Sequence, residues 1–210
     1  MTDIAIVDYG MGNLRSVEQA LRHVAPELAI IVTDDARVID AATRVVFPGQ
    51  GAMPDCMREM EARGLHNAVV QAAKNKPFLG ICIGLQMLFE HSAEGDVAGL
   101  GVLKGDVVRF APNMLDARGG KLKVPHMGWN QVHHAEHALW NGIAEDARFY
   151  YVHSYYVQPQ DAALIQATSD YPAPFVCAVA QENLFAVQFH PEKSQAAGLQ
   201  LLKNFIQWNP

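Results

Sequence analysis

The segment PFLGICIGLQMLFE, residues 77–90, changes its hydrophobic pattern in the middle. Its first half is a continuous apolar run, which is typical of a strand buried on both faces. In its second half Leu85, Leu88 and Phe89 follow the spacing of a helix. We therefore expect a strand that turns sharply into a helix, with Cys82 at the turn between two glycines.

Apolar runs of the same kind recur through the first half of the chain. Helix-like periods separate them, and this alternation predicts repeated βα units with a parallel sheet covered on both faces. The predicted strands are 4–7, 29–32, 45–47 and 78–81, and the predicted helical faces are Leu14, Val17, Leu21 and Val24 after a cap at Asn13, and Met57, Met60 and Leu65 after Asp55.

After residue 101 the pattern changes to alternation, as in GDVVRF, RFYYVHSYYV and FVCAVAQENLFAVQF. The last of these predicts two strands joined at Glu182-Asn183. No repeat, low-complexity tract or linker marks a boundary, so we expect one domain, 1–210, of class α/β with a strand-rich C-terminal half. A closing helix is predicted after Ser194, with an inward stripe of Leu199, Leu202, Phe205 and Ile206.

Composition excludes several classes of function. With 210 residues, of which 50% are apolar, the chain can bury a full core. The 16 Lys and Arg against 22 Asp and Glu give a net charge of −6, which argues against nucleic acid or an anionic membrane as partner. Asp3 and Asp8 stand where a signal peptide would need positive charge, and no apolar stretch suits a membrane span, so we expect a cytoplasmic protein. Three widely spaced cysteines argue against a disulfide framework.

Cys82 is at the centre of GICIG, residues 80–84, which is the nucleophile-elbow pattern G-x-S-x-G with cysteine in place of serine. The glycines leave room for the strained turn that exposes the central side chain. The start of the following helix favours a thiolate, and the backbone N–H of Ile83 is free to bind an oxyanion. The alternative is a cysteine packed in a core strand, but the glycines and the change of pattern favour the nucleophile. Cys56 and Cys177 lack such surroundings, and we expect them to be structural.

A thiol nucleophile needs a base, and FHPEKS supplies His190 and Glu192 at the end of a predicted strand, 184–189. Pro191 keeps the residue before it extended, so side chains two positions apart tend to face the same side. His190 can then move the proton while Glu192 fixes its tautomer. Taken alone, the motif is equally compatible with a solvated strand-end turn. The order cysteine, histidine, glutamate along the chain argues against an α/β-hydrolase.

Two other motifs fail in their surroundings. His133, Glu136 and His137 have the H-x-x-E-H spacing of a metalloprotease, but no long helix is predicted there, so we expect a solvated loop and no metal. Gly10-Met11-Gly12 follows a strand as a dinucleotide fingerprint would, but Arg15 holds the third glycine position. We expect no cofactor.

The cysteine elbow with the distant FHPEKS motif resembles the triad class (class I) of glutamine amidotransferases. Four more segments, spanning nearly the whole chain, are similar to one branch of that class, the glutaminase subunits of imidazole glycerol phosphate synthase in histidine biosynthesis. The resemblance implies a flavodoxin-like, three-layer doubly wound sheet. The four segments are DYGMGNLRSV (8–17), PGQGAM (48–53), HMGWN (126–130) and YYVHSYYV (150–157).

The resemblance also implies a role for each matching residue. Cys82 is the nucleophile, His190 the acid and base, and Glu192 its orienter. Gln50 departs from the Pro-Gly-Val-Gly that the family would have, but the oxyanion donor there is a backbone group, so the change affects the loop's preferences more than its chemistry. The implied substrate-binding residues are those of the oxyanion site, one residue a helical turn after the nucleophile, and two from a predicted strand, 150–157: Gly49, Gln50, Gly51, Ile83, Gln86, Ser154 and Tyr155.

The implied reaction hydrolyses glutamine to glutamate and ammonia through a cysteinyl thioester. Bulk water would protonate the ammonia, so it needs a dry path to a second active site. The chain has no phosphate-cradling glycine loop with a lysine. The resemblance therefore implies a heterodimer with a cyclase subunit of TIM-barrel fold, which makes imidazole glycerol phosphate and an aminoimidazole carboxamide ribotide. We expect HMGWN and the loop 10–15 at that interface.

Three alternatives stay open from the residues. The chain could be the glutaminase subunit of another ammonia-channelling synthase. It could also be a cysteine-elbow hydrolase or chaperone-like protein of related fold, against which Gln86 and His-Pro-Glu count. A domain that only regulates its partner would be expected to lack Cys82 or His190, and both are present.

Overall fold

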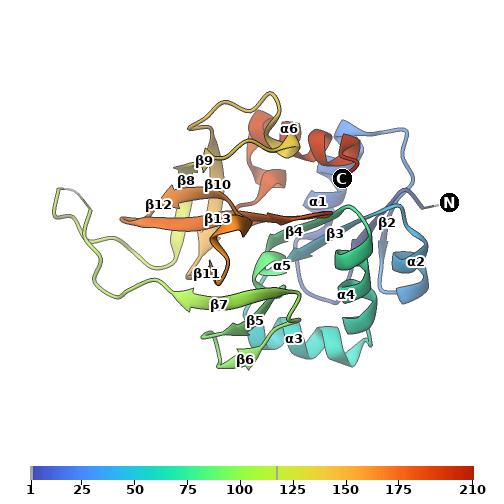
Figure 1. The fold of residues 1–210 in the computed structure, drawn as a ribbon, viewed down its shortest axis with the longest axis horizontal. Helices are drawn as coiled ribbons and strands as arrows, with labels where there is room; N and C mark the ends of the chain where they lie inside the picture. The colour runs from blue at the N-terminus through green and yellow to red at the C-terminus, as the bar shows by residue number, and fades with distance from the viewer. Residues whose placement is uncertain (1, 117) are drawn as a thin grey trace.

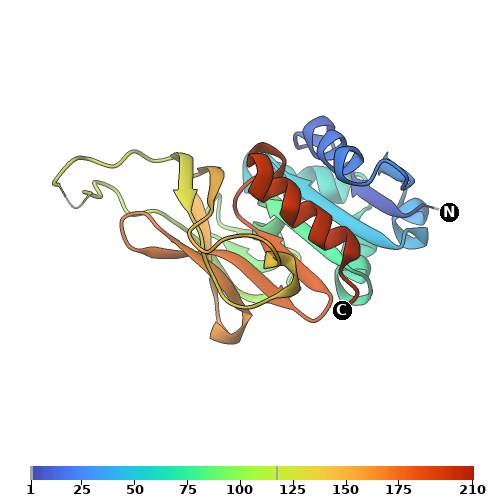
Figure 2. The ribbon, with the colours of Figure 1, turned by 90° about the horizontal axis from the view of Figure 1, so that it is seen from above.

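The computed structural model describes residues 2–116 and 118–210 (Figure 1). Among these residues twelve strands form one mixed sheet, and two more form a separate ribbon. Helices cover both faces of the parallel part of the sheet (Figure 2). The predicted α/β class, with a doubly wound sheet and a strand-rich C-terminal half, is therefore confirmed.

The first half of the chain builds the parallel part of the sheet. Its strands lie in the order β2-β1-β3-β4-β14, the flavodoxin-like order 2-1-3-4-5, with β14 from the end of the chain as the fifth strand. Each strand predicted in the first half is present, with small shifts at the ends. The bounds are β1 (Ile4–Val7), β2 (Ile30–Thr33), β3 (Arg44–Gly49), β4 (Phe78–Cys82) and β14 (Leu184–Val187).

The helices divide between the two faces as right-handed crossovers require. The connection from β1 to β2 runs toward one edge and places α1 beside α6, whereas the connections through β3 to β4 run the other way and place α2 beside α4 (Figures 1 and 2). No helix in the described residues is both long enough and apolar enough to span a membrane. The bounds are α1 (Leu14–Val24), α2 (Ala36–Ala41), α3 (Met53–Ala62), α4 (His66–Asn75) and α6 (Gln195–Gln207).

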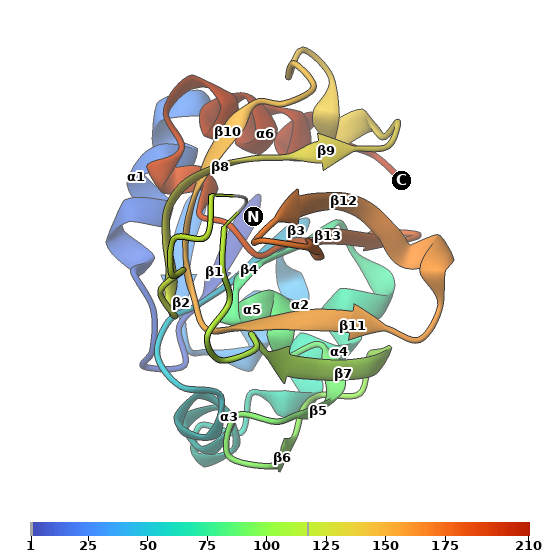
Figure 3. The ribbon, with the colours of Figure 1, turned by 90° about the vertical axis from the view of Figure 1, so that its left-hand side faces the viewer.

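The second half of the chain extends the sheet beyond β14 and adds the ribbon (Figure 3). The predicted turn at Glu182-Asn183 joins β13 to β14, with Gln181 opposite Leu184. The sheet then continues through β11, β7, β5 and β6, with β12 beside β13 and β9 beside β12. The bounds are β5 (Phe89–Ser92), β6 (Val97–Ala98), β7 (Leu103–Arg109), β9 (His133–His134), β11 (Tyr155–Pro159), β12 (Ile165–Asp170) and β13 (Pro174–Gln181); the ribbon is β8 (His126–Gln131) with β10 (Arg148–His153); η1 (Ala138–Trp140), η2 (Ala162–Leu164) and η3 (Pro191–Lys193) are 3-10 helices.

The helix predicted after Cys82 is much shorter than its spacing suggested. α5 covers only Ile83–Gln86, and Phe89 begins strand β5. The carbonyl oxygens of Leu88 and Phe89 accept hydrogen bonds from the backbone N–H groups of residues 101–103, so this segment pairs with β7 instead of continuing the helix. Apolar residues suit a buried strand as well as a helix, and the pairing decides between them.

The predicted strand 150–157 is in fact two strands. β10 ends at His153 in the ribbon, β11 begins at Tyr155 in the main sheet, and Ser154 is the break between them. The carbonyl oxygen of Ser154 accepts from the N–H of Phe110 at 3.1 Å. Aromatic and β-branched residues continue on both sides of the break, so the sequence pattern does not reveal it.

The helix boundaries differ from prediction in two places. Asn13 precedes α1, but its side chain makes no capping hydrogen bond. Leu65, predicted on the same helix as Met57 and Met60, lies outside α3, because Gly64 with a φ of +66° ends that helix and Leu65 precedes α4.

The closing helix α6 is rotated relative to its predicted stripe. Leu202 and Phe205 are buried as predicted, but Leu199 and Ile206 are only partly buried. Leu201, which the predicted stripe left out, is fully buried. A one-residue shift rotates a helix by about 100°, so an approximate stripe places only part of the contact face correctly.

Candidate active site

The carboxyl ends of three neighbouring parallel strands, β3, β4 and β14, bring the predicted site residues together. Gly49 at the end of β3 is in register with Cys82 at the end of β4. Val187 at the end of β14 is in register with Ile81, so the chain that leads to His190 leaves the sheet beside Cys82. Residues from the beginning, middle and end of the sequence therefore meet at the sheet edge where open α/β folds bind ligands.

Cys82 is held in the strained conformation that the elbow pattern predicts. Its φ is +57° and its ψ is −111°, a region that costs a residue with a side chain about 1–3 kcal/mol and persists only where the surroundings enforce it. Close packing enforces it here. A Cβ on Gly84 would overlap the carbonyl oxygen of Phe47, and a Cβ on Gly80 would be 2.9 Å from that of Ala186.

His190 and Glu192 form a buried pair. His190 Nδ1 is 2.8 Å from Glu192 Oε1, and the two side chains are 4% and 1% exposed. Burial acts to lower the pKa of His190, but the Cys82 sulfur and the Glu192 carboxylate outweigh it and raise the pKa to about 10. The imidazole therefore carries a proton at neutral pH. Its Nε2 has no hydrogen-bond partner within the described part of the chain.

The backbone around this pair is different from the predicted extended run. His190 itself is extended, with φ −105° and ψ 95°, but Pro191 begins the 3-10 helix η3. The N–H of His190 donates to the carbonyl oxygen of Tyr150 at 2.9 Å, and Ser194 Oγ donates to the carbonyl oxygen of His190 at 2.6 Å. The imidazole is thus anchored to the ribbon as well as to β14.

A cavity of about 310 Å³ opens where these elements meet. Most of the predicted site residues line it. The two that do not are Gly49, which is in register with Cys82 on the neighbouring strand, and Glu192, which is hydrogen-bonded to His190. The lining residues are Gln50, Gly51, Cys82, Ile83, Gln86, Glu94, Pro125, Val152, His153, Ser154, Tyr155 and His190.

Gln86 presents only one free polar atom to this cavity. Its side-chain Nε2 donates to the carbonyl oxygen of Tyr155 at 3.1 Å and to Gln188 Oε1 at 3.0 Å, so both amide hydrogens are used. Its Oε1 is buried and has no partner among the described residues. A buried acceptor without a donor is costly, so Gln86 is prepared to accept a hydrogen bond from a ligand.

Glu94 and Gln188 are two polar residues of the site that the sequence analysis missed. Glu94 is the only carboxylate among the lining residues, and its Oε2 accepts from the N–H of Met53 at 2.9 Å. Gln188 is fully buried, and its Nε2 is 3.8 Å from the Cys82 sulfur, to which it donates. Gln188 interrupts an apolar strand next to His190, which is a detectable signal, whereas nothing in the sequence around Glu94 connects it with this pocket.

The predicted oxyanion loop, residues 49–51, follows β3 directly. The carbonyl oxygen of Gln50 accepts a weak hydrogen bond from the Cys56 thiol at 3.6 Å. Gln50 is exposed and is one of the residues that line the cavity, so glutamine at this position replaces no buried side chain. Burial raises the pKa of Cys56 and of Cys177 to about 11, which makes both thiols poor nucleophiles.

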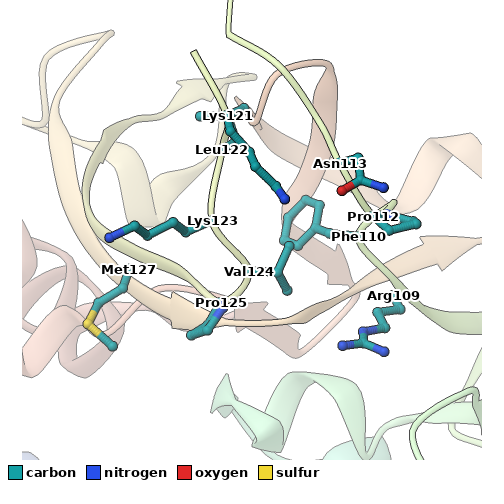
Figure 4. Close-up of a pocket in the computed structure, with 10 residues that line it drawn as sticks. All are labelled: Arg109, Phe110, Pro112, Asn113, Lys121, Leu122, Lys123, Val124, Pro125 and Met127. Carbon is teal, nitrogen blue, oxygen red and sulfur yellow. The ribbon is translucent and has the colours of Figure 1, made fainter.

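The rejected metal pattern forms no helix. His133 belongs to the two-residue strand β9 and pairs with Asp146 at 2.8 Å, and His137 precedes η1 and packs against Phe185 and Trp208. A larger hollow of about 680 Å³ is lined mainly by the two arms of the loop that joins β7 to β8 (Figure 4). It borders the smaller cavity through Pro125 but contains none of the predicted site residues, and perturbed titratable groups gather in the smaller one.

The comparisons with known proteins agree with this geometry. The family model for class-I glutamine amidotransferases matches residues 5–208. The solved structure of PurLQS from Thermotoga maritima aligns with a TM-score of 0.68 at 20% identity, covering 99% of this chain and 97% of that chain, which shows a shared fold.

Curated relatives are much more similar in sequence. The HisH subunit of imidazole glycerol phosphate synthase from Nitrosospira multiformis is 66% identical, over 100% of this chain and 100% of that protein. The HisH subunit from Dechloromonas aromatica is 63% identical, over 99% of this chain and 97% of that protein. The chain therefore belongs to the class I glutamine amidotransferases, and within them to the HisH subunits of imidazole glycerol phosphate synthase.

Proposed function

We propose that this protein is the glutaminase subunit of imidazole glycerol phosphate synthase in histidine biosynthesis. It hydrolyses glutamine to glutamate and ammonia and passes the ammonia to a cyclase subunit. The observation that carries the proposal is one cavity lined by a cysteine held at a strained elbow and by a histidine that is hydrogen-bonded to a buried glutamate and whose pKa is raised. The sequence identity to HisH subunits selects this synthase among ammonia-using enzymes.

Cys82 and His190 carry out the first half of the reaction. The Cys82 sulfur bonds to the side-chain amide carbon of glutamine, and the His190 Nε2–H, which has no protein partner in the described residues, gives its proton to the amide nitrogen. The carbon–nitrogen bond breaks and ammonia leaves a cysteinyl thioester. Glu192 holds the imidazole by its Nδ1 so that Nε2 points to the reacting atoms.

Water completes the reaction at the same carbon. His190, now neutral, takes a proton from the attacking water, the carbon–sulfur bond breaks, and glutamate is released with the thiolate–imidazolium pair restored. Each attack places negative charge on the former amide oxygen. The N–H of Ile83, at the start of α5, and the N–H groups of the loop 49–51 are the donors proposed for it.

The α-ammonium group of glutamine binds between two acceptors. Gln86 offers Oε1, its only free polar atom, and Glu94 supplies the negative charge. Ser154 and Tyr155, whose carbonyl oxygen accepts from Gln86, also line the cavity and are proposed to contact the rest of the substrate. Because Gln86 has no free donor, it binds the ammonium and not the carboxylate of the substrate.

The partner is a cyclase of TIM-barrel fold on a separate chain. Met127 and Trp129 point to the same side of β8 and are 62% and 42% exposed, which is unusual for large apolar side chains and typical of a surface that a partner covers. Pro125, just before β8, lines the cavity, so this surface continues to the active site. The loop 10–15 is proposed for the same interface.

The test is release of glutamate from glutamine by the purified protein, alone and with the cyclase and its ribotide substrate. We expect slow release by the isolated chain and fast release by the complex with ribotide. Cys82→Ala should abolish release while the complex still forms and still uses added ammonia. Glutamine turnover that survives Cys82→Ala, or its absence in the complete wild-type complex, would contradict the proposal.

A further inference from the structure

Two buried histidines face each other across the ribbon, next to the cavity. His126 begins β8 and His153 ends β10, and the two residues are directly paired in register. His126 Nδ1 is 2.9 Å from His153 Nε2, and the residues are 4% and 6% exposed. His153 Nδ1 is 2.8 Å from the carbonyl oxygen of Tyr155, and Asn130 Nδ2 is 3.3 Å from His126 Nε2.

The chemistry of the partners fixes the direction of every bond in this series. A carbonyl oxygen can only accept, so His153 carries its proton on Nδ1 and its neutral Nε2 accepts from Nδ1–H of His126. Burial lowers the pKa of His126 to about 4 and that of His153 to about 3, so both rings are neutral. The N–H of Gln131 donates to Asn130 Oδ1 at 2.9 Å, so the Asn130 amide nitrogen is the atom that faces His126 Nε2; the same nitrogen also donates to the carbonyl oxygen of Asp170 at 2.8 Å.

The series ends on an oxygen that also holds the substrate side of the cavity. The Tyr155 carbonyl oxygen accepts from His153 Nδ1 and from Gln86 Nε2, so its two lone pairs are both used. Gln86 is in turn joined to Gln188, which donates to the Cys82 sulfur. A continuous hydrogen-bonded path thus runs from Asn130 on the ribbon to the nucleophile.

We propose that Asn130, His126 and His153 are positioning residues of the glutamine pocket. Their one-way chain of hydrogen bonds fixes the Tyr155 carbonyl oxygen, which holds Gln86 so that its free Oε1 meets the substrate. This inference rests on the proposed function, because it assigns Gln86 Oε1 to the substrate ammonium. None of the three side chains touches the reacting atoms, so their effect is on binding of glutamine before the chemical step.

Packing is the competing explanation, because His126 is also stacked between aromatic rings. Its ring centroid lies 4.9 Å from that of Tyr151 and 4.1 Å from that of Tyr171. Two substitutions separate the explanations. His126→Phe keeps the stacked ring and removes the donor to His153, whereas His126→Asn loses the ring and keeps an amide N–H near the position of Nδ1.

We measure kcat and KM for glutamine in the complex with the cyclase and its ribotide. His126→Phe should raise KM about tenfold, the effect of about 1.4 kcal/mol expected for one buried hydrogen bond, with a smaller change in kcat. His126→Asn should keep KM within about threefold of wild type. A reversed order of the two variants, or wild-type KM in both, would overturn the inference. If the variants only reduced the amount of folded protein, kcat would fall while KM stayed constant, and this result would also count against the inference.

Two further measurements keep the test independent of folding and of turnover. Asn130→Leu removes the first donor outside the aromatic cluster and should raise KM about threefold, and an unchanged KM contradicts the chain. The nitrogen-15 shifts of the ring nitrogens should place the proton on Nδ1 in both histidines. A proton on Nε2 of His153 overturns the inference, and this measurement does not depend on turnover. Absence of glutamate release by the wild-type complex is a different outcome, which defeats the proposed function. His134→Phe, in a histidine stacked on Trp140, is the matched control and should leave KM unchanged.

Discussion

The elbow at the end of β4 and the ribbon of β8 and β10 hold side chains at the same cavity by different means. At the elbow, backbone packs on backbone: Gly84 lies against the carbonyl of Phe47, and no side chain fits between them. In the ribbon, His126 and His153 are held by directed hydrogen bonds between side chains. The two glycines that the elbow requires lie close together in the sequence, although the groups that they pack on, Phe47 and Ala186, are distant. In the ribbon the two hydrogen-bonding histidines are themselves distant in sequence, and only the fold brings them together.

His190 depends on both regions. Its strand β14 pairs with β4, and its N–H and carbonyl groups bond to Tyr150 of the ribbon and to Ser194. Ser194 Oγ also accepts from the N–H of Tyr150 at 3.0 Å, so the turn after His190 is closed against β10. A change in either region can therefore move the imidazole, but through different contacts.

Substitution of Gly84 by alanine should have the largest effect. The added methyl group would overlap the carbonyl oxygen of Phe47, and because both groups belong to packed backbone, α5 and β3 must separate. We expect the free energy of unfolding to fall by about 3 kcal/mol, measured by denaturant titration, with loss of glutaminase activity.

Gly64→Ala is the control for this prediction. Gly64 has a φ of +66° and nothing within 4 Å of an added Cβ, so alanine there meets only the left-handed backbone penalty of about 1 kcal/mol. Equal losses of stability in the two variants would mean that close packing does not hold the elbow, and the contrast with the ribbon would disappear.

The same contrast explains which parts of the fold were predictable. The buried strands and the elbow are encoded by residues close together, so the run 78–81 and the glycines around Cys82 predicted them. Phe89 was placed wrongly in a helix because its partner strand β7 lies later in the chain. The break at Ser154 was missed because both sides of it favour strands equally well.

Residue chemistry set a similar limit at the site. His190 and Glu192 could be paired from a motif of three residues, and their hydrogen bond is local. Glu94 could not be found, because it reaches the cavity through the unforeseen strand β5. The partners of Gln86 are distant in sequence, so which of its amide atoms stays free for a ligand follows only from the three-dimensional network.

Gln188 allows the link between the ribbon and the elbow to be tested next. Gln188→Met keeps the length of the side chain but removes the donor to the Cys82 sulfur and the acceptor for Gln86. We expect kcat/KM for glutamine to fall about tenfold, because a buried amide hydrogen of Gln86 loses its partner. The rate at which iodoacetamide alkylates Cys82, followed by mass spectrometry, should also differ from that of wild type.

Gln200→Met is the matched control, since Gln200 bonds to Asn204 on α6, outside the residues that line the cavity. It should leave kcat/KM within about twofold of wild type, as surface substitutions usually do. If Gln188→Met behaved like this control, the elbow would keep Cys82 active without Gln188, and the hydrogen-bonded path would have no effect on the sulfur.

The smallest expected effect concerns acid. Burial lowers the pKa of His126 to about 4 and that of His153 to about 3, whereas an unfolded chain would bind these protons near pH 6.5. Above pH 6.5 these two histidines are neutral in both states and cost the folded protein no stability. As the pH falls from 6.5 toward 4, the free energy of unfolding decreases, because the unfolded state takes up protons that the folded ribbon cannot. Between pH 6.5 and 5.5, the free energy of unfolding of wild type should fall by about 1 kcal/mol more than that of His126→Phe. Parallel plots of unfolding free energy against pH for the two proteins would mean that His126 takes up its proton without opening the ribbon. The ribbon would then not depend on the directed hydrogen bonds of a neutral His126, and its contrast with the elbow would be lost.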